Sequence, residues 1–355
     1  MSLDDLRKEI DQIDSRLVEL LARRAKIAEN IGLEKVNMGR QIEDKQREKA
    51  VLKKAKELAR KEGLDEADIE AIYQHIIALS RNRQGVSVAF QGEIGSYSEE
   101  AAFSFFGSHI QTRPYESLEG VFQAVEQDET QFGIAPIENS LEGSIARTYD
   151  LLLESDLKTC GELELKISHC LIAKKGATLD SIKKVYSHPQ ALGQCQAFLK
   201  HLGCELVPTY DTAGSVKMIK DKAITNGAAI ASYRAAGIYD MKVLAREIQD
   251  NAFNFTRFFV LGKEDSPQTG HDKTSIVFSV KHKPGALYNF LKDLTENNIN
   301  MTKIESRPTR QKPWEYNFYL DFEGHRQDNK AKEALEKLEA SALFVKVLGS
   351  YPKAK

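Results

Sequence analysis

Three short polar segments, far apart along the chain, have the residue types of a ligand pocket. They are Glu138-Asn139-Ser140, Ser187-His188-Pro189-Gln190 and Thr256-Arg257-Phe258, and each lies in apolar, strand-like surroundings. Polar side chains that gather at strand ends, away from any capping role, usually line a pocket. We therefore predict that these segments contribute to a binding or active site.

A glycine-containing loop, Gly92-Glu93-Ile94-Gly95-Ser96-Tyr97-Ser98, stands between a predicted strand and a helix expected to begin near Glu99. Its backbone N–H groups and hydroxyls could hold a carboxylate. The loop lacks the third glycine of a dinucleotide-binding fingerprint and has no phosphate-binding lysine. Taken alone, it could equally be an ordinary turn followed by a helix cap.

Basic residues near the N-terminus are spaced so that they share a helix face. Arg24 and Lys35 are eleven residues apart, which is ~20° from whole turns and about 16 Å along the axis. Two such cations could close on a small dianion. Further polar residues follow at one-turn spacing, namely Asp44, Arg47 and Glu48, and then Ser80 and Gln84. Polar faces of three helices can converge inside a bundle, although each residue alone could be a solvated surface charge.

The elements that must position these residues fall into three parts. Apolar residues at three- and four-residue steps predict helices over 1–37, 41–62 and 65–83. After Gly85, helices alternate with buried strands expected at 86–90, 132–137, 163–173, 184–187, 228–231 and 258–261. This alternation indicates an α/β domain of two lobes, with crossovers between the lobes at Ser140–Arg147 and Asn251–Thr256.

The last part reads as strand, helix, two strands, helix and strand. The strands are expected at 275–280, 299–306, 314–322 and 343–348, and the helices at 287–297 and 329–340. This order is the α+β ferredoxin-like arrangement. We therefore predict a multidomain chain with an all-α region at 1–85, a two-lobed α/β region at 86–265 and an α+β region at 271–355.

Composition narrows the classes of function. The chain has 355 residues with 50 basic and 52 acidic side chains, so charge gives no case for nucleic acid or an anionic membrane as partner. Four cysteines form no CxxC pair and have no second ligand set for a metal. They are expected to be reduced thiols in a cytosolic protein. The N-terminus does not have the pattern of a signal peptide, and no apolar run could cross a bilayer.

The three parts of the chain resemble three different protein families. The spacing of polar residues before Gly85 is similar to that of the all-helical chorismate mutases, through Arg7, Arg24, Lys35, Asp44, Arg47, Glu48, Ser80 and Gln84. The segment from about Val86 to Lys263 resembles prephenate dehydratase, because the glycine loop and the three polar segments stand in that family's order. The last part resembles a phenylalanine-sensing ACT domain, through Gly285-Ala286-Leu287 and Glu305-Ser306-Arg307-Pro308.

The chorismate mutase resemblance implies that Arg7 and Arg24 hold two carboxylates, while Lys35 and Gln84 donate to the ether oxygen. It assigns the ring hydroxyl to Asp44 and Glu48, with Arg47 and Ser80 in support. The rearrangement is pericyclic, so it needs a bound near-attack conformer and donors aimed at the growing negative charge rather than a nucleophile or base.

The position of Arg7 implies a second subunit. It is 17 residues before Arg24, about 25 Å along a straight helix and ~100° around it, so both cannot reach one ligand from the same chain. A helix of roughly 50 Å is also longer than a small domain needs. Both arguments predict an intertwined dimer with shared sites. The whole protein is then expected to be a homodimer or a homotetramer. The alternative is a helical dimerisation module that has no site.

The dehydratase resemblance implies loss of carbon dioxide and a ring hydroxyl without metal or cofactor. We expect Thr256 to be essential as a hydrogen-bond donor to the leaving hydroxyl and Glu138 to serve as the acid. The positioning and binding residues are expected to be Ser96, Tyr97, Ser98, Asn139, Ser140, Gln190, Arg257 and Phe258. For Arg257, pairing with a carboxylate and bracing the turn stay equally open. His188 is expected to be a turn residue, and His169 a buried histidine with satisfied hydrogen bonds.

The ACT resemblance implies that L-phenylalanine binds at Gly285-Ala286-Leu287 and Glu305-Ser306-Arg307-Pro308, although such a module can also serve only for dimer contacts. The resulting expectation is a bifunctional enzyme that converts chorismate to prephenate and then to phenylpyruvate, inhibited by phenylalanine. Two alternatives stay open. One is the same architecture acting on arogenate, and the other is a non-catalytic amino-acid sensor.

Overall fold

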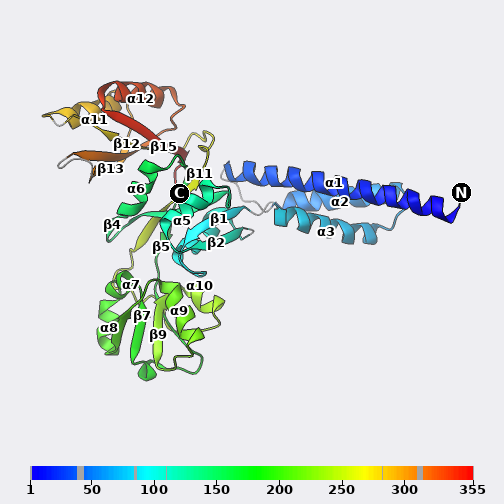
Figure 1. Cartoon of the computed structure of the whole chain (residues 1–355), viewed down its shortest axis with the longest axis horizontal. Coiled ribbons are helices and arrows are strands. Elements are labelled where there is room, and N and C mark those ends of the chain that lie inside the picture. The colour runs from blue at the N-terminus through cyan, green and yellow to red at the C-terminus, as the bar shows by residue number, and fades with distance from the viewer. Residues whose placement is uncertain are drawn as a thin grey trace. The chain divides into compact units, whose positions relative to one another are not determined.

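Three helices form the first part of the chain in this computed structural model, which describes residues 2–37, 44–83, 86–108, 110–281, 283–309 and 315–354 (Figure 1). They are α1 (Leu3–Asn37), α2 (Lys45–Lys61) and α3 (Glu66–Arg83). Asp44 caps α2 by accepting a hydrogen bond from the backbone N–H of Arg47. Gly63, with φ of 70°, lies at the turn between α2 and α3. The predicted all-helical region is confirmed.

The chain divides into two compact units, Met1–Ser87 with Phe106–Gln111, and Val88–Phe105 with Thr112–Lys355. No helix among the described residues is long and apolar enough to cross a membrane.

The first lobe of the second unit is built on a six-stranded sheet in the order β2-β1-β3-β11-β5, with β4 paired to β3. The strands are β1 (Ser87–Gln91), β2 (Gln111–Tyr115), β3 (Phe132–Asn139), β4 (Gly143–Ser144), β5 (Lys158–Lys166) and β11 (Phe255–Gly262). The helices are α4 (Tyr97–Phe106), α5 (Leu118–Glu126) and α6 (Ala146–Glu154). Because β11 lies between β3 and β5, residues far apart in sequence meet in the middle of this sheet.

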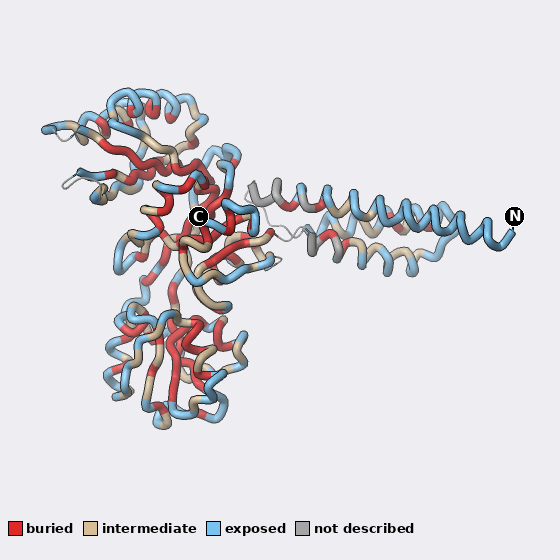
Figure 2. Tube along the Cα trace, viewed as in Figure 1, coloured by how far each residue is buried: buried red, intermediate tan, exposed pale blue. Residues whose placement is uncertain are grey.

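The second lobe has a five-stranded sheet in the order β10-β6-β9-β7-β8. Its strands are β6 (Cys170–Ala173), β7 (Lys184–Ser187), β8 (Glu205–Pro208), β9 (Gly227–Ala231) and β10 (Lys242–Ala245). Its helices are α7 (Pro189–Gly193), α8 (Gln196–Leu202), α9 (Thr212–Asp221), α10 (Tyr233–Ile238) and the short η1 (Leu179–Ser181). Every residue of β9 is buried, as expected for a strand covered on both faces (Figure 2).

The chain passes between the two sheets at residues 167–169 and 246–254. The second passage overlaps the predicted crossover at Asn251–Thr256. The crossover predicted at Ser140–Arg147 is wrong, because that segment contains β4 and the start of α6 within the first lobe. The strand predicted at 163–173 divides into β5 and β6, which belong to different sheets. Polar Ser168 and His169 stand at this division.

The last part of the unit is an antiparallel sheet in the order β13-β14-β12-β15. Its elements are β12 (Asp272–Ser279), α11 (Ala286–Glu296), β13 (Met301–Pro308), β14 (Tyr316–Glu323), α12 (Asn329–Ser341) and β15 (Phe344–Pro352). The ferredoxin-like prediction is thereby confirmed. One face of the sheet packs on α11 and α12, where Phe278 stacks on Phe290. The other face joins the core of the first lobe through Val277, Tyr319 and Tyr351.

Candidate functional site

Residues from both lobes of the second unit line a cavity of about 810 Å³. All three predicted polar segments and the glycine loop reach its wall. The predicted residues that line it are Ser96, Tyr97, Ser98, Asn139, His188, Gln190, Thr256 and Phe258. The strands β3 and β11 contribute to the first-lobe side, and the N-terminal ends of α4, α7 and α9 also border the cavity.

Asn139 and Thr256 are partners in the register of β3 and β11. The side-chain oxygen of Asn139 accepts hydrogen bonds from the backbone N–H groups of Leu141 at 3.0 Å and Glu142 at 3.2 Å. Its Nδ2 atom therefore points the other way, and it donates to Oγ1 of Thr256 at 3.0 Å. A hydroxyl oxygen that accepts from an amide can still donate its own hydrogen. The hydroxyl of Thr256, which lines the cavity, thus keeps its own hydrogen free to donate to another partner.

A chain of amide side chains supports this orientation. Nδ2 of Asn139 also donates to Oδ1 of Asn254 at 2.8 Å, and Nδ2 of Asn254 donates to Oε1 of Gln194 at 2.7 Å. Nε2 of Gln194 then donates to the Glu142 carboxylate at 2.9 Å. All these bonds run in one direction and end on a charge, so no amide in the chain can flip without losing a partner. Sequence reasoning missed Asn254 and Gln194, although Asn254 lies two residues before Thr256.

His169 is buried and hydrogen-bonded, as expected. Its Nε2 atom lies 3.0 Å from Oε1 of Gln194, and its Nδ1 atom lies 2.9 Å from the hydroxyl of Tyr97. Since the Gln194 oxygen only accepts, we assign the hydrogen to Nε2. Burial lowers the pKa of His169, while the hydrogen bond with Gln194 opposes this shift. His169 is therefore a wall residue that holds Tyr97 and Gln194 in place, and the Tyr97 hydroxyl also donates to the carbonyl oxygen of Ser168 at 2.8 Å.

The opposite part of the cavity wall is acidic. Glu93, Glu116 and Asp211 line it, and none of the described lining residues is lysine or arginine. Burial raises the pKa of Asp211, which also accepts a hydrogen bond from the N–H of Gly214 at 2.6 Å and caps α9. Gly92 has φ of 104°, and a Cβ atom there would lie 2.7 Å from the Asp211 carboxylate. This close approach explains why glycine stands at that position.

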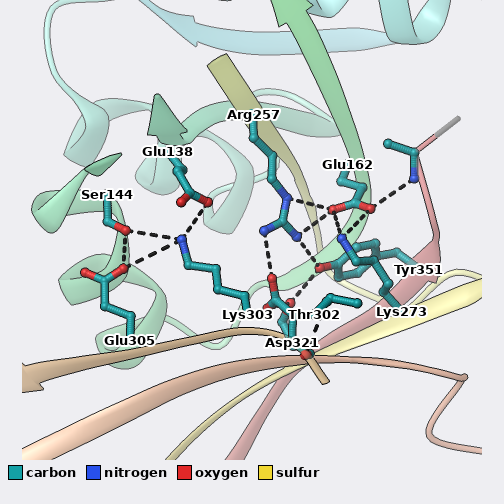
Figure 3. A network of polar contacts seen from close by, with 12 residues as sticks. Glu138, Ser144, Glu162, Arg257, Lys273, Thr302, Lys303, Glu305, Asp321 and Tyr351 are labelled. Carbon is teal, nitrogen blue, oxygen red and sulfur yellow. Dashed lines mark hydrogen bonds and ion pairs between the residues drawn. The ribbon is translucent and has the colours of Figure 1, made fainter. Parts of the chain in front are cut away.

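Three predicted site residues lie away from the cavity. Glu138 precedes Asn139 in β3, and successive strand residues point to opposite faces. Its carboxylate pairs with Lys303 at 2.6 Å (Figure 3). Arg257 likewise points away from the cavity, as described below. Ser140 binds the backbone at Phe253 instead. The prediction that Glu138 is the acid is therefore not supported by its position, and Ser140 and Arg257 do not reach the cavity as binding residues.

Arg257 pairs with carboxylates of the protein itself. Its guanidinium donates to Glu162 at 2.8 Å and to Asp321 at 2.7 Å. Burial opposes its charge, but Asp321, Tyr351 and Glu162 outweigh burial and raise the pKa of Arg257. Two roles were left open for this arginine, and the structure shows the pairing with carboxylates. These carboxylates belong to Glu162 and Asp321 of the protein and not to a ligand.

The helical unit brings two of its predicted residues together. A guanidinium nitrogen of Arg24 contacts the hydroxyl of Ser80 and lies 3.3 Å from the carbonyl oxygen of Ile76. Arg7 is exposed and lies 3.7 Å from Asp4. Asp44, Arg47 and Glu48 lie at the start of α2, where Asp44 serves as the cap. The side chain of Lys35 and all of Gln84 lie outside the described residues.

Both predicted ACT motifs lie at element ends. Gly285 adopts φ of 77° and stands immediately before α11, so Gly285-Ala286-Leu287 opens that helix. Glu305-Ser306-Arg307-Pro308 closes β13. Glu305 contacts Ser144 of the first lobe and Arg307 of its own strand.

Comparison with known proteins accounts for all three parts. Family models match in order: Chorismate mutase type II over residues 6–85, Prephenate dehydratase over 88–266 and ACT domain over 274–340. A bifunctional chorismate mutase/prephenate dehydratase of Aquifex aeolicus is 39% identical, over 99% of this chain and 98% of the relative. The chain belongs to the bifunctional chorismate mutase/prephenate dehydratase family. It has both activities, in phenylalanine biosynthesis.

The prephenate dehydratase match contains the whole cavity described above. A solved prephenate dehydratase from Arthrobacter aurescens, in complex with L-Phe, has a TM-score of 0.69 and 30% identity, covering 76% of this chain and 90% of that one. A relative called arogenate dehydratase/prephenate dehydratase 2, from Arabidopsis thaliana, is 43% identical over 76% of this chain and 74% of its own. Family membership sets aside the alternatives of a non-catalytic sensor and of a helical module without a site.

Proposed function

We propose that the cavity binds prephenate with its ring hydroxyl beside Thr256. The hydrogen bond from Asn139 to Thr256 supports this proposal, since it leaves the threonine hydrogen free to donate to a ligand in the cavity that Thr256 lines. The bond from the ring to the carboxylate breaks, its electron pair enters the ring, and the hydroxide leaves as the ring becomes aromatic. A threonine hydroxyl is too weak an acid to protonate the hydroxide, so Thr256 stabilises it by hydrogen bonding.

The two carboxylates of prephenate need different surroundings. Ser96 and Ser98 offer hydroxyls, and the start of α4 offers its dipole, to the carboxylate that is retained. Apolar lining from Ile145 and Phe258 suits the carboxylate that is lost as neutral carbon dioxide. The test is to supply purified protein with chorismate and follow prephenate and phenylpyruvate. Accumulation of prephenate without phenylpyruvate would contradict the assignment.

A second substrate is favoured by the acidic wall of the cavity. Glu93 pairs with Lys217 at 3.0 Å, while Glu116 and Asp211 line the wall with no lysine or arginine among the described lining residues. An ammonium group, as in arogenate, suits such a wall better than a second anion does. The name of the Arabidopsis relative includes both substrates. We propose that arogenate is accepted as well, and relative rates on the two substrates test this.

For the helical unit, we propose a dimer whose sites combine Arg24 and Ser80 of one chain with Arg7 of another. Several apolar side chains of α1 are more than half exposed in the single chain, including Leu3 at 64% and Ile10 at 56%. A second copy would cover this stripe, since long exposed apolar stripes rarely stay uncovered. Lys35 and Gln84, proposed to donate to the ether oxygen, complete the site. Loss of mutase activity on dilution to monomers would support the shared site.

Feedback control is the third part of the proposal. We infer that L-phenylalanine binds at Gly285-Ala286-Leu287 and the end of β13, between the ACT modules of two chains, and inhibits the dehydratase. The relative from Arthrobacter aurescens is in complex with L-Phe. Ser306→Ala should weaken phenylalanine binding, measured by calorimetry, and leave the uninhibited rate unchanged. Simple competition between phenylalanine and prephenate would place the inhibitor in the cavity instead.

A further inference from the structure

Four charged residues form a closed arrangement between the dehydratase sheet and the ACT sheet. Glu138 and Arg257 are register partners in β3 and β11, while Lys303 and Asp321 are register partners in β13 and β14. Two ion pairs join these partners across the interface: Glu138 with Lys303 at 2.6 Å and Arg257 with Asp321 at 2.7 Å (Figure 3). We call Glu138, Arg257, Lys303 and Asp321 the interface square.

Both dehydratase strands of the interface square also carry the cavity residues. Asn139 follows Glu138 in β3, and Thr256 precedes Arg257 in β11. Successive residues of a strand point to opposite faces. Each strand thus has an interface charge on one face and a cavity residue on the other. A shift of either strand that changes an ion pair must also change the 3.0 Å contact between Asn139 and Thr256.

The Arg257 side of the square is rigid. The side chains of Arg257 and Asp321 are 10% and 8% exposed, and Glu162 behind them is 1% exposed. Lys273 lies 3.0 Å from Glu162, so the two positive and two negative charges balance. Removing one member of such a buried set is strongly unfavourable, because an uncompensated charge is left behind. This side therefore holds the ACT sheet on β11.

The Lys303 side offers an alternative pairing. Nζ of Lys303 lies 2.6 Å from Glu138 but also 3.6 Å from Glu305, and 3.2 Å from the hydroxyl of Ser144. Glu305 in turn contacts Ser144 on β4, a strand that pairs with β3. A modest movement along β13 would exchange Glu138 for Glu305 as the main partner of Lys303. Two discrete partners for one cation provide the two states that a switch needs.

The strand β13 connects a ligand bound on one of its faces to Lys303 on the other. Lys303 and Glu305 point toward the first lobe, and strand alternation places Ile304 and Ser306 on the opposite face. Ser306 belongs to the segment proposed to hold phenylalanine. A ligand on one face of β13 therefore acts on the same strand that presents Lys303 on the other face.

We propose that Lys303 is the residue that transmits phenylalanine binding to the dehydratase. When phenylalanine binds, β13 moves, Lys303 passes from Glu138 to Glu305, and the end of β3 is released. Asn139 then no longer directs the hydroxyl of Thr256 into the cavity. This inference rests on the proposed feedback control, and it assigns Lys303 a positioning role with no contact to substrate.

The test compares Lys303→Met and Lys303→Arg with a matched control in the full-length protein. The control is Lys346→Met, because Nζ of Lys346 also joins the ACT sheet to the first lobe, donating to the carbonyls of Leu153 and Ser155 at 2.7 and 2.6 Å. These contacts involve neither β3 nor β11. Phenylalanine affinity is measured by calorimetry with and without bound substrate analogue, and dehydratase rate is measured against phenylalanine concentration.

In the unmodified protein, the analogue should weaken phenylalanine binding by roughly 5- to 150-fold, the usual range of such coupling, and the effect must be reciprocal. Lys303→Met should bind phenylalanine within about threefold of normal affinity while this coupling falls to about twofold or less. Because this variant lacks the pair with Glu138, its dehydratase rate without phenylalanine should already be lowered toward that of the inhibited protein, and saturating phenylalanine should change that rate little. Lys303→Arg should restore inhibition, and Lys346→Met should retain it.

The other possible outcomes would contradict either the role of Lys303 or the proposed feedback control. Normal inhibition in Lys303→Met would overturn the role of Lys303. Loss of phenylalanine binding itself in that variant would make Lys303 a ligand residue, and equal loss of inhibition in Lys346→Met would indicate general loosening of the ACT sheet. Both results would also overturn the inference. If the unmodified protein does not bind phenylalanine, then the proposed feedback control fails first.

Discussion

Nδ2 of Asn139 donates to Oγ1 of Thr256 across 3.0 Å, and the two residues are register partners at the ends of β3 and β11. The direction of this bond is fixed, because the oxygen of Asn139 is already held by two backbone N–H groups. Thr256 is therefore an acceptor toward Asn139, and its own hydrogen is left for another partner. The direction of one hydrogen bond decides what the threonine can do for a leaving hydroxide.

Removing the hydroxyl should stop the second reaction only. We expect Thr256→Ala to lower the dehydratase kcat by about 10²- to 10⁴-fold, the usual worth of a positioned proton donor. Chorismate turnover should stay near normal, because the mutase residues lie in the other unit. Thr256→Ser is the matched control and should retain substantial activity. A parallel loss of both rates in a folded variant would contradict the two-site assignment.

Reversing the polarity of the Asn139 contact should be nearly as harmful. In Asn139→Asp, a carboxylate oxygen would accept the threonine hydrogen and turn it away from the cavity, so the rate should fall by about 10²-fold. The rate should recover partly as pH falls, because a protonated carboxyl can donate again. Asn139→Ala should show no such recovery. Identical pH profiles of the two variants would argue against an orienting role for Asn139.

The raised pKa of Asp211 leads to a prediction about how the stability of the folded protein depends on pH. Burial is the main cause, and the charge of Glu93 adds to it. An acid whose folded pKa lies above its ordinary 3.8 destabilises the fold while it is ionised. Asp211→Asn keeps a helix cap and should raise the free energy of unfolding near neutral pH. The gain should disappear as pH falls through the raised pKa, as urea titrations at several pH values would show.

The same variant bears on substrate choice. Without the Asp211 carboxylate, the KM for prephenate should fall and the KM for arogenate should rise, because one ligand is repelled and the other attracted by that charge. Gly214 keeps its hydrogen-bond acceptor in the asparagine variant, so the shape of the wall is retained. If both KM values move in the same direction, the acidic wall does not discriminate between the substrates.

The shared mutase site can be tested by mixing inactive variants. Arg7→Ala and Lys35→Ala should each abolish mutase activity alone. Random subunit exchange makes about half of the dimers mixed, each with one intact site, so activity should return to about a quarter of normal. Exchange is checked independently by mass spectrometry. Failure to regain activity after confirmed exchange would mean that Arg7 acts within its own chain or not at all.

Sequence patterns predicted the parts of the fold whose apolar period is strong. The three helices and the ferredoxin-like part lie within a few residues of their expected ranges. The strands that were missed are the two-residue β4 and three strands at sheet edges, β2, β8 and β10. An edge strand buries little, as the exposed and polar β2 shows. Its conformation is set by its neighbour rather than by its own sequence, so no local signal could reveal it.

The residue types of the site were also predictable from the sequence. Which of these side chains would lie on the strand face that borders the cavity was only partly predictable. Asn139 and Thr256 reach the cavity, while the adjacent Glu138 and Arg257 do not. Alternation along a strand would have separated these pairs, but it could not say which face bounds the cavity. Asp211 escaped notice because its sequence context is that of an ordinary helix cap, and only the tertiary fold brings it beside Gly92.

The position of β11 in the first sheet has a consequence for synthesis of the protein on the ribosome. This strand lies between β3 and β5, yet Thr256 is separated from its neighbour Asn139 by 117 positions. The whole second lobe is translated in the interval. That lobe can close while the first still lacks its middle strand, and such distant pairing slows folding. The strand that completes the first lobe also delivers Thr256, so a nascent chain cannot acquire dehydratase activity before its first lobe is whole.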